Sequence, residues 1–182
     1  MKQIAVLVSG GGTNLQALID AERAGEVKGG KITLVIASNP SAYALERARQ
    51  AGITTAVISR KACADAHEFD QKIIELLDAN SIDLVVLAGF LSILGRAVTD
   101  RYHRRIINVH PALIPSFCGE GFYGLKVHQA ALDYGVKVTG ATVHFVNEIP
   151  DGGQIILQKA VCVFHRGVDF KSEEVVVHLH SL

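Results

Sequence analysis

Short apolar runs rich in β-branched residues alternate with segments of helical periodicity in the first half of this chain. The runs at residues 4–8, 32–36, 54–58 and 84–88 are almost continuously hydrophobic, as parallel strands covered on both faces tend to be. Two helices are indicated by apolar stripes, at Leu15, Leu18 and Ile19 and at Phe69, Ile73, Ile74 and Leu77. The pattern predicts a doubly wound α/β fold, with a mostly parallel central sheet and helices on both faces.

The second half of the chain follows a different pattern. We expect a short strand at residues 106–109, a loop rich in glycine, proline and aromatic residues at 112–123, and a helix at 127–134. Two further strands, at 136–146 and 154–163, are joined by a polar turn at 147–153. Because the 182 residues contain no internal repeat or linker, residues 1–182 are expected to form a single domain.

Charge and cysteine content exclude several classes of protein. Eighteen basic and eighteen acidic residues cancel, so we expect neither nucleic acid nor an anionic membrane as a partner. Cys63, Cys118 and Cys162 are far apart and odd in number, which fits neither a disulfide framework nor a zinc pair and favours a reducing compartment. The apolar run at residues 4–8 is too short for a signal peptide or a membrane span. The expected location is the cytoplasm.

A glycine loop, Ser-Gly-Gly-Gly-Thr-Asn at residues 9–14, follows the first expected strand. Its glycines permit a sharp turn that leaves amide N–H groups at the positive end of the next helix, which makes a cradle the size of a monophosphate. A triphosphate-binding loop is excluded because no Gly-Lys-Ser/Thr follows, and Leu15 replaces the third glycine of the dinucleotide-binding fingerprint. The alternative is a plain strand-to-helix turn with Thr13 as the helix cap.

Asn108 and His110 end another expected strand, at the edge of the sheet where doubly wound folds bind ligands. Being two residues apart in an extended segment, they point to the same side. An amide donor beside an imidazolium suits a carbonyl oxygen that becomes negative in a tetrahedral intermediate, as in acyl or formyl transfer. Asp151 opens a turn that can bring a carboxylate to the imidazole, favour its charged form, and relay a proton through water. A structural histidine and an ordinary turn are the alternatives.

Other kinds of catalytic site have little support. The sequence has no Gly-x-Ser-x-Gly nucleophile elbow, and none of its cysteines lies in a recognisable catalytic setting. His178 and His180 would lie on one side of a strand but lack further obvious ligands, so no metal is expected.

Together these motifs resemble the glycinamide ribonucleotide formyltransferase family of the bacterial type. The matching segments are residues 8–16, 45–49, 87–94, 108–115 and 140–153, and the match runs in family order over residues 1 to about 162. The resemblance implies a Rossmann-like formyltransferase fold. It also implies that 10-formyltetrahydrofolate, as co-substrate, gives its formyl group to the amine of glycinamide ribonucleotide in de novo purine biosynthesis.

The resemblance implies a role for each matched position. The ribonucleotide phosphate would be held by Gly12, Thr13 and Asn14. Asn108 and His110 would face the formyl oxygen, and Asp151 would tune the protonation of His110 and assist proton removal. The reduced folate would be bound by Leu91, Ser92, Ile93, Leu94, Asn108, Asn147, Glu148, Ile149 and Pro150.

Three features depart from the family pattern. Ala66 and Ser92 stand where the family often has basic residues, which bears on affinity more than on chemistry. Residues 117–124 form a loop that is longer than in some members, and we expect it to close over the site and exclude water. The tail after Val163 does not align with the long helix that carries a substrate-binding glutamate in the family, and an unpaired apolar tail can weaken a fold or recruit a partner chain.

Three alternative functions remain. A formyltetrahydrofolate hydrolase needs only water as acceptor, which leaves the glycine loop unexplained. A methionyl-tRNA formyltransferase needs a further nucleic-acid-binding domain and a basic surface. A catalytically impaired homologue that binds ribonucleotide or folate is the non-enzymatic alternative. The sequence leaves the oligomeric state open, with a homodimer among the arrangements.

Overall fold

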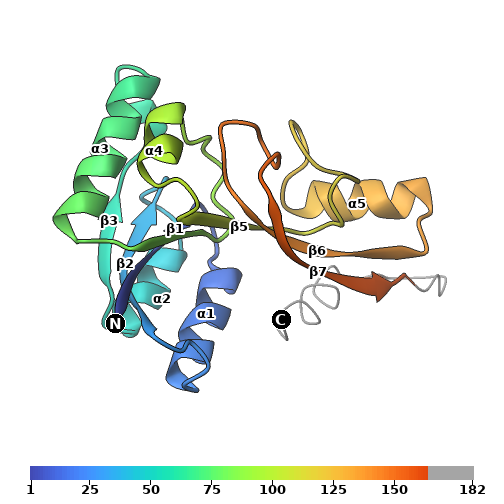
Figure 1. The fold of residues 1–182 in the computed structure, drawn as a ribbon, viewed down its shortest axis with the longest axis horizontal. Coiled ribbons are helices and arrows are strands. Elements are labelled where there is room, and N and C mark those ends of the chain that lie inside the picture. The colour runs from blue at the N-terminus through green and yellow to red at the C-terminus, as the bar shows by residue number, and fades with distance from the viewer. Residues whose placement is uncertain (164–182) are drawn as a thin grey trace. The chain divides into compact units, whose positions relative to one another are not determined.

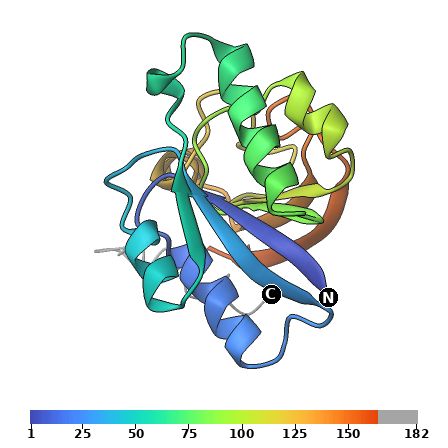
Figure 2. The ribbon, with the colours of Figure 1, turned by 90° about the vertical axis from the view of Figure 1, so that its left-hand side faces the viewer.

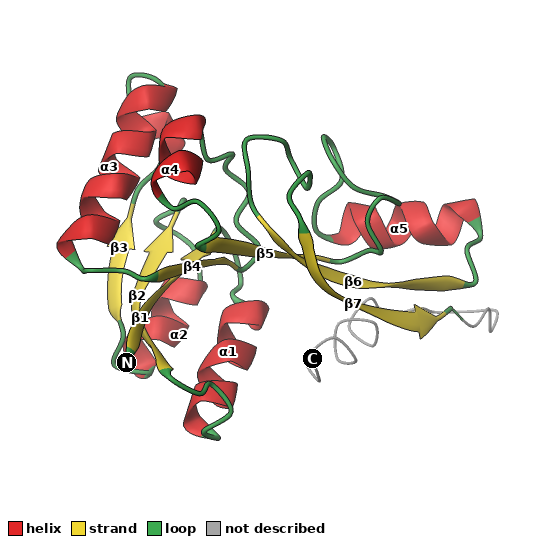
Figure 3. Cartoon of the chain, viewed as in Figure 1, coloured by secondary structure: helices red, strands yellow, loops and turns green. Residues whose placement is uncertain are grey.

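The computed structural model describes residues 1–163, which form a seven-stranded sheet in the order β3-β2-β1-β4-β5-β6-β7 with helices along it (Figures 1 and 3). This mostly parallel arrangement confirms the predicted doubly wound α/β fold. The described residues divide into two compact units, Met1–Asn108 and residues 109–163. The tail after Val163, including His178 and His180, lies outside the described residues.

The first unit holds the parallel part of the sheet. Its elements are β1 (Lys2–Val8), α1 (Thr13–Arg23), β2 (Gly30–Ala37), α2 (Ala44–Gln50), β3 (Thr54–Val57), the short 3-10 helix η1 (Arg60–Ala62), α3 (Ala66–Ala79), β4 (Leu84–Leu87), α4 (Arg96–Arg101) and most of β5 (Ile106–His110). The pairs β1–β2, β1–β4, β2–β3 and β4–β5 are all parallel. Helices α1 and α2 cover one face of these strands, and α3 and α4 cover the other (Figure 2).

The core of the first unit follows the predicted apolar pattern. The last five residues of β1, Ile4–Val8, are buried, as expected for a central strand covered on both faces. Leu15 and Ile19 of α1 are buried on one face, and Phe69, Ile73 and Leu77 of α3 are buried on the other. Each such side chain stabilises the fold by roughly 1.5–3 kcal/mol relative to the exposed state.

Helix α3 begins with two side-chain hydrogen bonds that resemble a capping box. The side chain of Asp65 accepts the amide N–H of Glu68 at 2.8 Å, and the Glu68 carboxylate accepts the amide N–H of Ala64 at 2.5 Å. Helix α1 begins differently, because its N-cap residue is Gly12, with a φ of 74° and no side-chain cap. Thr13 is the first helical residue, so the expectation that its side chain caps the helix is wrong.

Two short helices had no signal in the apolar pattern. Helices α2 and α4 have seven and six residues, too few to repeat an apolar stripe. Helix α4 is tied to α3 by the buried carboxylate of Asp70, which accepts the amide N–H of Gly95 at 3.0 Å. A Cβ atom at Gly95 would overlap this carboxylate, so a larger residue there would have to displace the Asp70 side chain.

The second unit contains the last residues of β5, then α5 (Leu125–Tyr134), β6 (Val138–Phe145) and β7 (Ile155–Cys162). Strands β6 and β7 form an antiparallel pair, with a register shift between Val143 and His144. The long stretch between β5 and α5 is irregular, as its glycine and proline content predicted. Within residues 1–163, no helix combines the length and hydrophobicity needed to cross a membrane.

Candidate active site

The glycine loop of the first unit is open on one side and tightly packed on the other. Ideal Cβ atoms built on Gly10 and Gly11 would meet nothing within 4 Å. A Cβ atom on Gly12 would lie 2.6 Å from Cβ of Ala44, and the positive φ of Gly12 also disfavours other residues. Gly12 is therefore required by the packing of the loop against α2, while Gly10 and Gly11 leave room for a ligand.

The segment that resembles a folate-binding segment is anchored to the end of β1. The hydroxyl of Ser9 accepts the amide N–H of Leu91 at 2.8 Å and lies 2.6 Å from the hydroxyl of Ser38. Leu91 and Ile93 are exposed, by 60% and 71%, so they can offer apolar contact. Ser92 is half-buried, and Leu94 is buried in the first unit, where its side chain presents no surface to a ligand.

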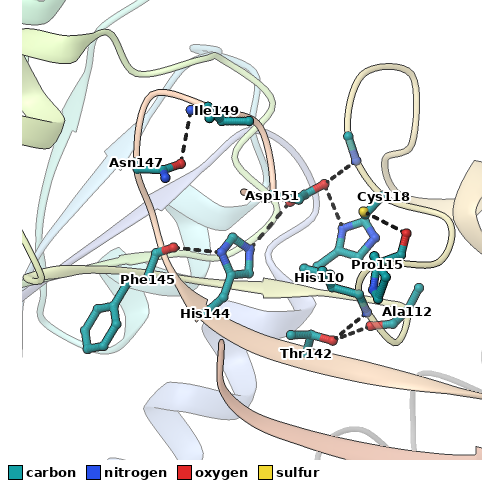
Figure 4. Close-up of polar contacts among 12 residues, drawn as sticks. His110, Ala112, Pro115, Cys118, Thr142, His144, Phe145, Asn147, Ile149 and Asp151 are labelled. Carbon is teal, nitrogen blue, oxygen red and sulfur yellow. Dashed lines mark hydrogen bonds and ion pairs between the residues drawn. The ribbon is translucent and has the colours of Figure 1, made fainter. Parts of the chain in front are cut away.

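Asp151 lies between two buried histidines of the second unit (Figure 4). Its Oδ2 atom is 3.4 Å from Nδ1 of His110, at the end of β5, and its Oδ1 atom is 3.5 Å from Nε2 of His144, on β6. Oδ2 also accepts the amide N–H of Gly119 at 2.9 Å. The predicted contact between Asp151 and His110 is present, and the sequence prediction missed His144.

Each imidazole makes a second hydrogen bond on the side away from Asp151, and this bond shows which ring nitrogen carries a proton. Nε2 of His110 lies 2.8 Å from the carbonyl oxygen of Phe117, and Nδ1 of His144 lies 2.8 Å from that of Phe145. A carbonyl oxygen only accepts, so each of these nitrogens carries a proton. The nitrogen that faces Asp151 then carries a proton only in the imidazolium form. The carboxylate of Asp151 therefore faces the one nitrogen of each ring that has no backbone carbonyl as its partner.

The ionised form of Asp151 is stabilised by its surroundings. Burial works to raise the pKa of Asp151, but the hydrogen bond from His144, the amide N–H of Gly119 and the charges of both imidazoles outweigh it and hold the pKa below its usual value. Asp151 also has a φ of 55°, a left-handed conformation that a non-glycine residue adopts at some cost. The turn before it is held by Asn147, whose side chain accepts the amide N–H of Ile149 at 3.1 Å.

The loop at residues 117–124 contacts His110 and Asp151 through its backbone. The carbonyl oxygen of Phe117 accepts a hydrogen bond from Nε2 of His110, and the amide N–H of Gly119 donates one to the carboxylate of Asp151. Phe117 has a φ of 50°, which is strained for an aromatic residue, and its ring makes edge contacts with Phe122 and Tyr134. In this conformation the loop uses hydrogen-bonding groups of both side chains.

Thr142 fixes the backbone that follows His110. Its buried hydroxyl donates to the carbonyl of Ala112 at 2.7 Å and accepts the amide N–H of Ile114 at 3.1 Å. Gln158 of β7 donates to the carbonyl of Ile114 at 2.9 Å and to the Thr142 hydroxyl at 3.0 Å. Thr142 and His144 alternate along β6 as buried polar residues, which is the sequence signal that could have identified them.

Two titratable groups near His110 and Asp151 are held in their neutral forms. Burial, together with the nearby charge of His110, lowers the pKa of His128 on α5. Burial and the negative charge of Asp151 raise the pKa of the Cys118 thiol, which donates to the carbonyl of Pro115. Cys118 is therefore poorly suited to act as a nucleophile.

The remaining predicted residues are distributed between the units. Asn108 is the last residue of the first unit and lies two positions before His110 in β5, so the strand turns the two side chains to one face. Glu148, Ile149 and Pro150 are exposed in the turn before Asp151. Across residues 1–163, no group of three histidine, cysteine or acidic side chains is arranged to hold a metal ion.

Comparison with known proteins identifies the family. The formyl transferase family model matches residues 2–178. The chain is 45% identical to phosphoribosylglycinamide formyltransferase of Haemophilus influenzae, over 90% of this chain and 74% of that protein. It is also 45% identical to the human trifunctional purine biosynthetic protein adenosine-3, over 88% of this chain and 15% of that longer protein. The crystal structure of glycinamide ribonucleotide transformylase 1 from Symbiobacterium toebii superposes with a TM-score of 0.88 at 39% identity, covering 100% of this chain and 81% of that one.

These matches extend over both units and far exceed a single shared motif. The chain belongs to the formyl transferase family and, within it, to the phosphoribosylglycinamide formyltransferases.

Proposed function

We propose that the chain transfers the formyl group of 10-formyltetrahydrofolate to the primary amine of glycinamide ribonucleotide, in purine biosynthesis in the cytoplasm. The observation that carries this proposal is the half-buried carboxylate of Asp151, paired with the buried His110 at 3.4 Å in a chain of this family. The family match across both units supports one formyltransferase domain. The proposed partners are the ribonucleotide and the reduced folate, with no metal required.

The proposed chemistry begins with attack by the amine nitrogen on the formyl carbon. The carbonyl oxygen becomes an oxyanion, which the amide of Asn108 and the imidazolium of His110 stabilise by hydrogen bonds. The attacking amine becomes acidic as its bond to carbon forms. It loses a proton through water to the Asp151–His110 pair, and the leaving N10 atom of the folate gains a proton as its bond to carbon breaks.

Asp151 contributes by remaining ionised near neutral pH, because its pKa lies below the usual value. A negative carboxylate 3.4 Å from Nδ1 of His110 would accept a hydrogen bond from the imidazolium that stabilises the oxyanion. His144 contacts the other carboxylate oxygen and so fixes the orientation of Asp151. We assign His144 as a positioning residue, because it acts through Asp151.

The loop at residues 117–124 must shift during this reaction. The formyl oxygen and the carbonyl oxygen of Phe117 would compete for the same nitrogen of His110, since a single N–H cannot make a good hydrogen bond to both. We propose that binding of the formyl folate displaces the Phe117 carbonyl, and that the strained backbone of Phe117 makes this displacement less costly. The loop would then exclude water from the occupied site.

The exposed amides of the glycine loop supply the proposed phosphate site. Gly11 and Gly12 precede the N-terminus of α1, where backbone N–H groups and the helix dipole favour an anion. We assign the reduced folate to the predicted segments 91–94 and 147–150. The exposed side chains of Leu91, Ile93 and Ile149 support this assignment, because they offer apolar surface.

An assay of the purified protein tests the proposed reaction. Formylated ribonucleotide should accumulate only when both glycinamide ribonucleotide and 10-formyltetrahydrofolate are present. Formate release at the same rate without the ribonucleotide would instead identify a hydrolase. Thermal stabilisation by both ligands without any product would identify a binding homologue.

A further inference from the structure

We propose that Gln158 of β7 is a positioning residue for the formyl transfer. This inference rests on the proposed function, because it concerns the backbone that carries His110. Through the hydroxyl of Thr142, Gln158 would fix residues 112–116, which we call the loop stem. The stem joins the strand that carries His110 to the loop at residues 117–124. His110 would then keep its place while that loop moves.

The strand pairing brings the side chains of Gln158 and Thr142 together. The two residues are direct partners in the antiparallel pair of β6 and β7, so their side chains lie on one face of the sheet. The amide nitrogen of Gln158 donates to the carbonyl oxygen of Ile114 at 2.9 Å and to the hydroxyl of Thr142 at 3.0 Å. Gln158 is exposed on the edge strand of the sheet, where water could satisfy its amide group. The two protein acceptors instead give this group a fixed direction.

The hydroxyl of Thr142 has all of its hydrogen-bonding capacity in use. It donates to the carbonyl of Ala112 at 2.7 Å (Figure 4), and it accepts the amide N–H of Ile114 at 3.1 Å and the side-chain amide of Gln158. A hydroxyl offers one donor and two acceptor lone pairs. Because donors occupy both lone pairs, the hydroxyl hydrogen can point only at Ala112. Gln158 therefore helps to set the direction of the bond that holds the start of the stem.

The loop stem is held along its length, and the backbone strain begins after it. Gly140 lies two residues before Thr142 on the same face of β6, and a Cβ atom there would be 2.8 Å from the side chain of Leu113. The amide N–H of Ser116 donates to the carbonyl of Leu113 at 2.9 Å. The left-handed φ of 50° occurs only at Phe117. The stem thus ends where the loop is proposed to move.

A displaced stem would move His110, because only Pro111 separates the two. The proline ring fixes one backbone angle and restricts the residue before it, so this link absorbs little movement. The imidazole of His110 lies 3.4 Å from Asp151, and a small shift would disturb this contact and the direction of the catalytic N–H. Misplacement of a reacting group lowers the rate of the chemical step. Substrate binding is spared, because Gln158 is not among the predicted binding residues.

Steady-state kinetics of Gln158 variants tests the inference. Gln158→Met keeps the length of the side chain but removes its donors, and it should lower kcat about 5- to 10-fold, as expected for loss of about one neutral hydrogen bond. KM for the ribonucleotide and KM for the folate should stay close to wild type. Gln158→Lys should retain most of kcat, because an ammonium group can donate to both oxygens. Gln154→Met makes the same chemical change at an exposed glutamine just before β7, and should behave as wild type.

Two kinetic results would overturn the role of Gln158. One is an unchanged kcat in Gln158→Met, and the other is a loss of activity carried by KM or shared equally by Gln154→Met. If the wild-type protein forms no product, the proposed reaction fails separately, and NMR then decides the question. The role is supported if Gln158→Met speeds amide exchange of Ile114 and shifts the ring nitrogen resonances of His110. It is refuted if the His110 resonances stay the same.

Discussion

The carboxylate oxygen Oδ1 of Asp151 lies 3.5 Å from Nε2 of His144, a buried histidine of β6. The other ring nitrogen of His144 donates to the backbone carbonyl of Phe145, so the ring is fixed at both ends. The second carboxylate oxygen of Asp151 remains directed at His110. His144 therefore controls the orientation of a group that acts on the proposed catalytic histidine.

Replacing His144 should lower turnover without weakening substrate binding. His144→Gln keeps a polar side chain but removes the ring that spans Phe145 and Asp151. We expect kcat to fall about 10- to 100-fold, because a small misplacement of a reacting group is enough for such a loss. Both KM values should change little in steady-state assays. A loss of kcat matched by a loss of folded protein in thermal unfolding would assign His144 to stability alone.

Asp151→Asn should change the pH dependence of stability. The folded-state pKa of Asp151 lies below its usual value, so the ionised carboxylate stabilises the fold. This contribution is complete above the unfolded pKa of about 4 and is lost as the pH falls through the lower folded value. Wild type should therefore be more stable than the variant at neutral pH, and the difference should shrink in acid. Chemical denaturation at several pH values measures it, and a difference that grows in acid would contradict the assigned ion pairs.

Removing a contact that holds the Phe117 ring should strengthen binding of the formyl folate. Tyr134→Ala removes one edge contact with the Phe117 ring, a contact worth about 0.5–1.5 kcal/mol. If this contact stabilises the loop conformation in which Phe117 blocks His110, the folate should bind roughly 2- to 10-fold more tightly, and the amide of Gly119 should exchange faster. Tyr123→Ala is the matched control, because it removes another tyrosine ring, one that contacts Lys126. Equal effects of the two variants would exclude a specific role for the Phe117 contact.

The substitution Gly11→Ala tests by steric hindrance whether the phosphate binds at the glycine loop. Gly11→Ala adds a Cβ atom that meets no protein atom within 4 Å, so the fold should retain its stability. If the phosphate approaches the backbone here, KM for the ribonucleotide should rise while KM for the folate stays constant. Gly12→Ala should instead destabilise the protein, because its Cβ atom would collide with Ala44. An unchanged KM for the ribonucleotide in Gly11→Ala would place the phosphate elsewhere.

The sequence predicted the parallel sheet and its longer helices because these elements carry their signals locally. Strand β1 is a continuous apolar run, and α3 repeats its apolar residues over fourteen positions. Helices α2 and α4 are too short to repeat such a pattern. The packing of Ala44 against Gly12 depends on residues 32 positions apart, which no local pattern reveals. The sharp turn expected at these glycines agrees with the positive φ of Gly12, but its packing against Ala44 was found only in the structure.

The candidate site was predicted in part for the same reason. Asp151 and His110 could be paired because the turn and the strand end each placed a polar residue where ligands bind in such folds. His144 was missed because one histidine in an apolar strand resembles a structural residue. The contact between the Phe117 carbonyl and His110 was missed because every residue has a backbone carbonyl, so the sequence does not show which one will bind a side chain. Both were identified only from contacts in the structure between residues of the second unit.

The most direct test of formyl transfer assisted by His110 is a single-turnover experiment with glycinamide ribonucleotide and 10-formyltetrahydrofolate, comparing wild type with His110→Ala. Removal of an oxyanion donor is expected to slow formation of the formylated ribonucleotide by about 10²–10³-fold, with folding and ligand binding retained. Asn108→Ala should give a loss of similar size. Formation of product by His110→Ala at nearly the wild-type rate would contradict the proposed role of His110 and of the Asp151 carboxylate that supports it.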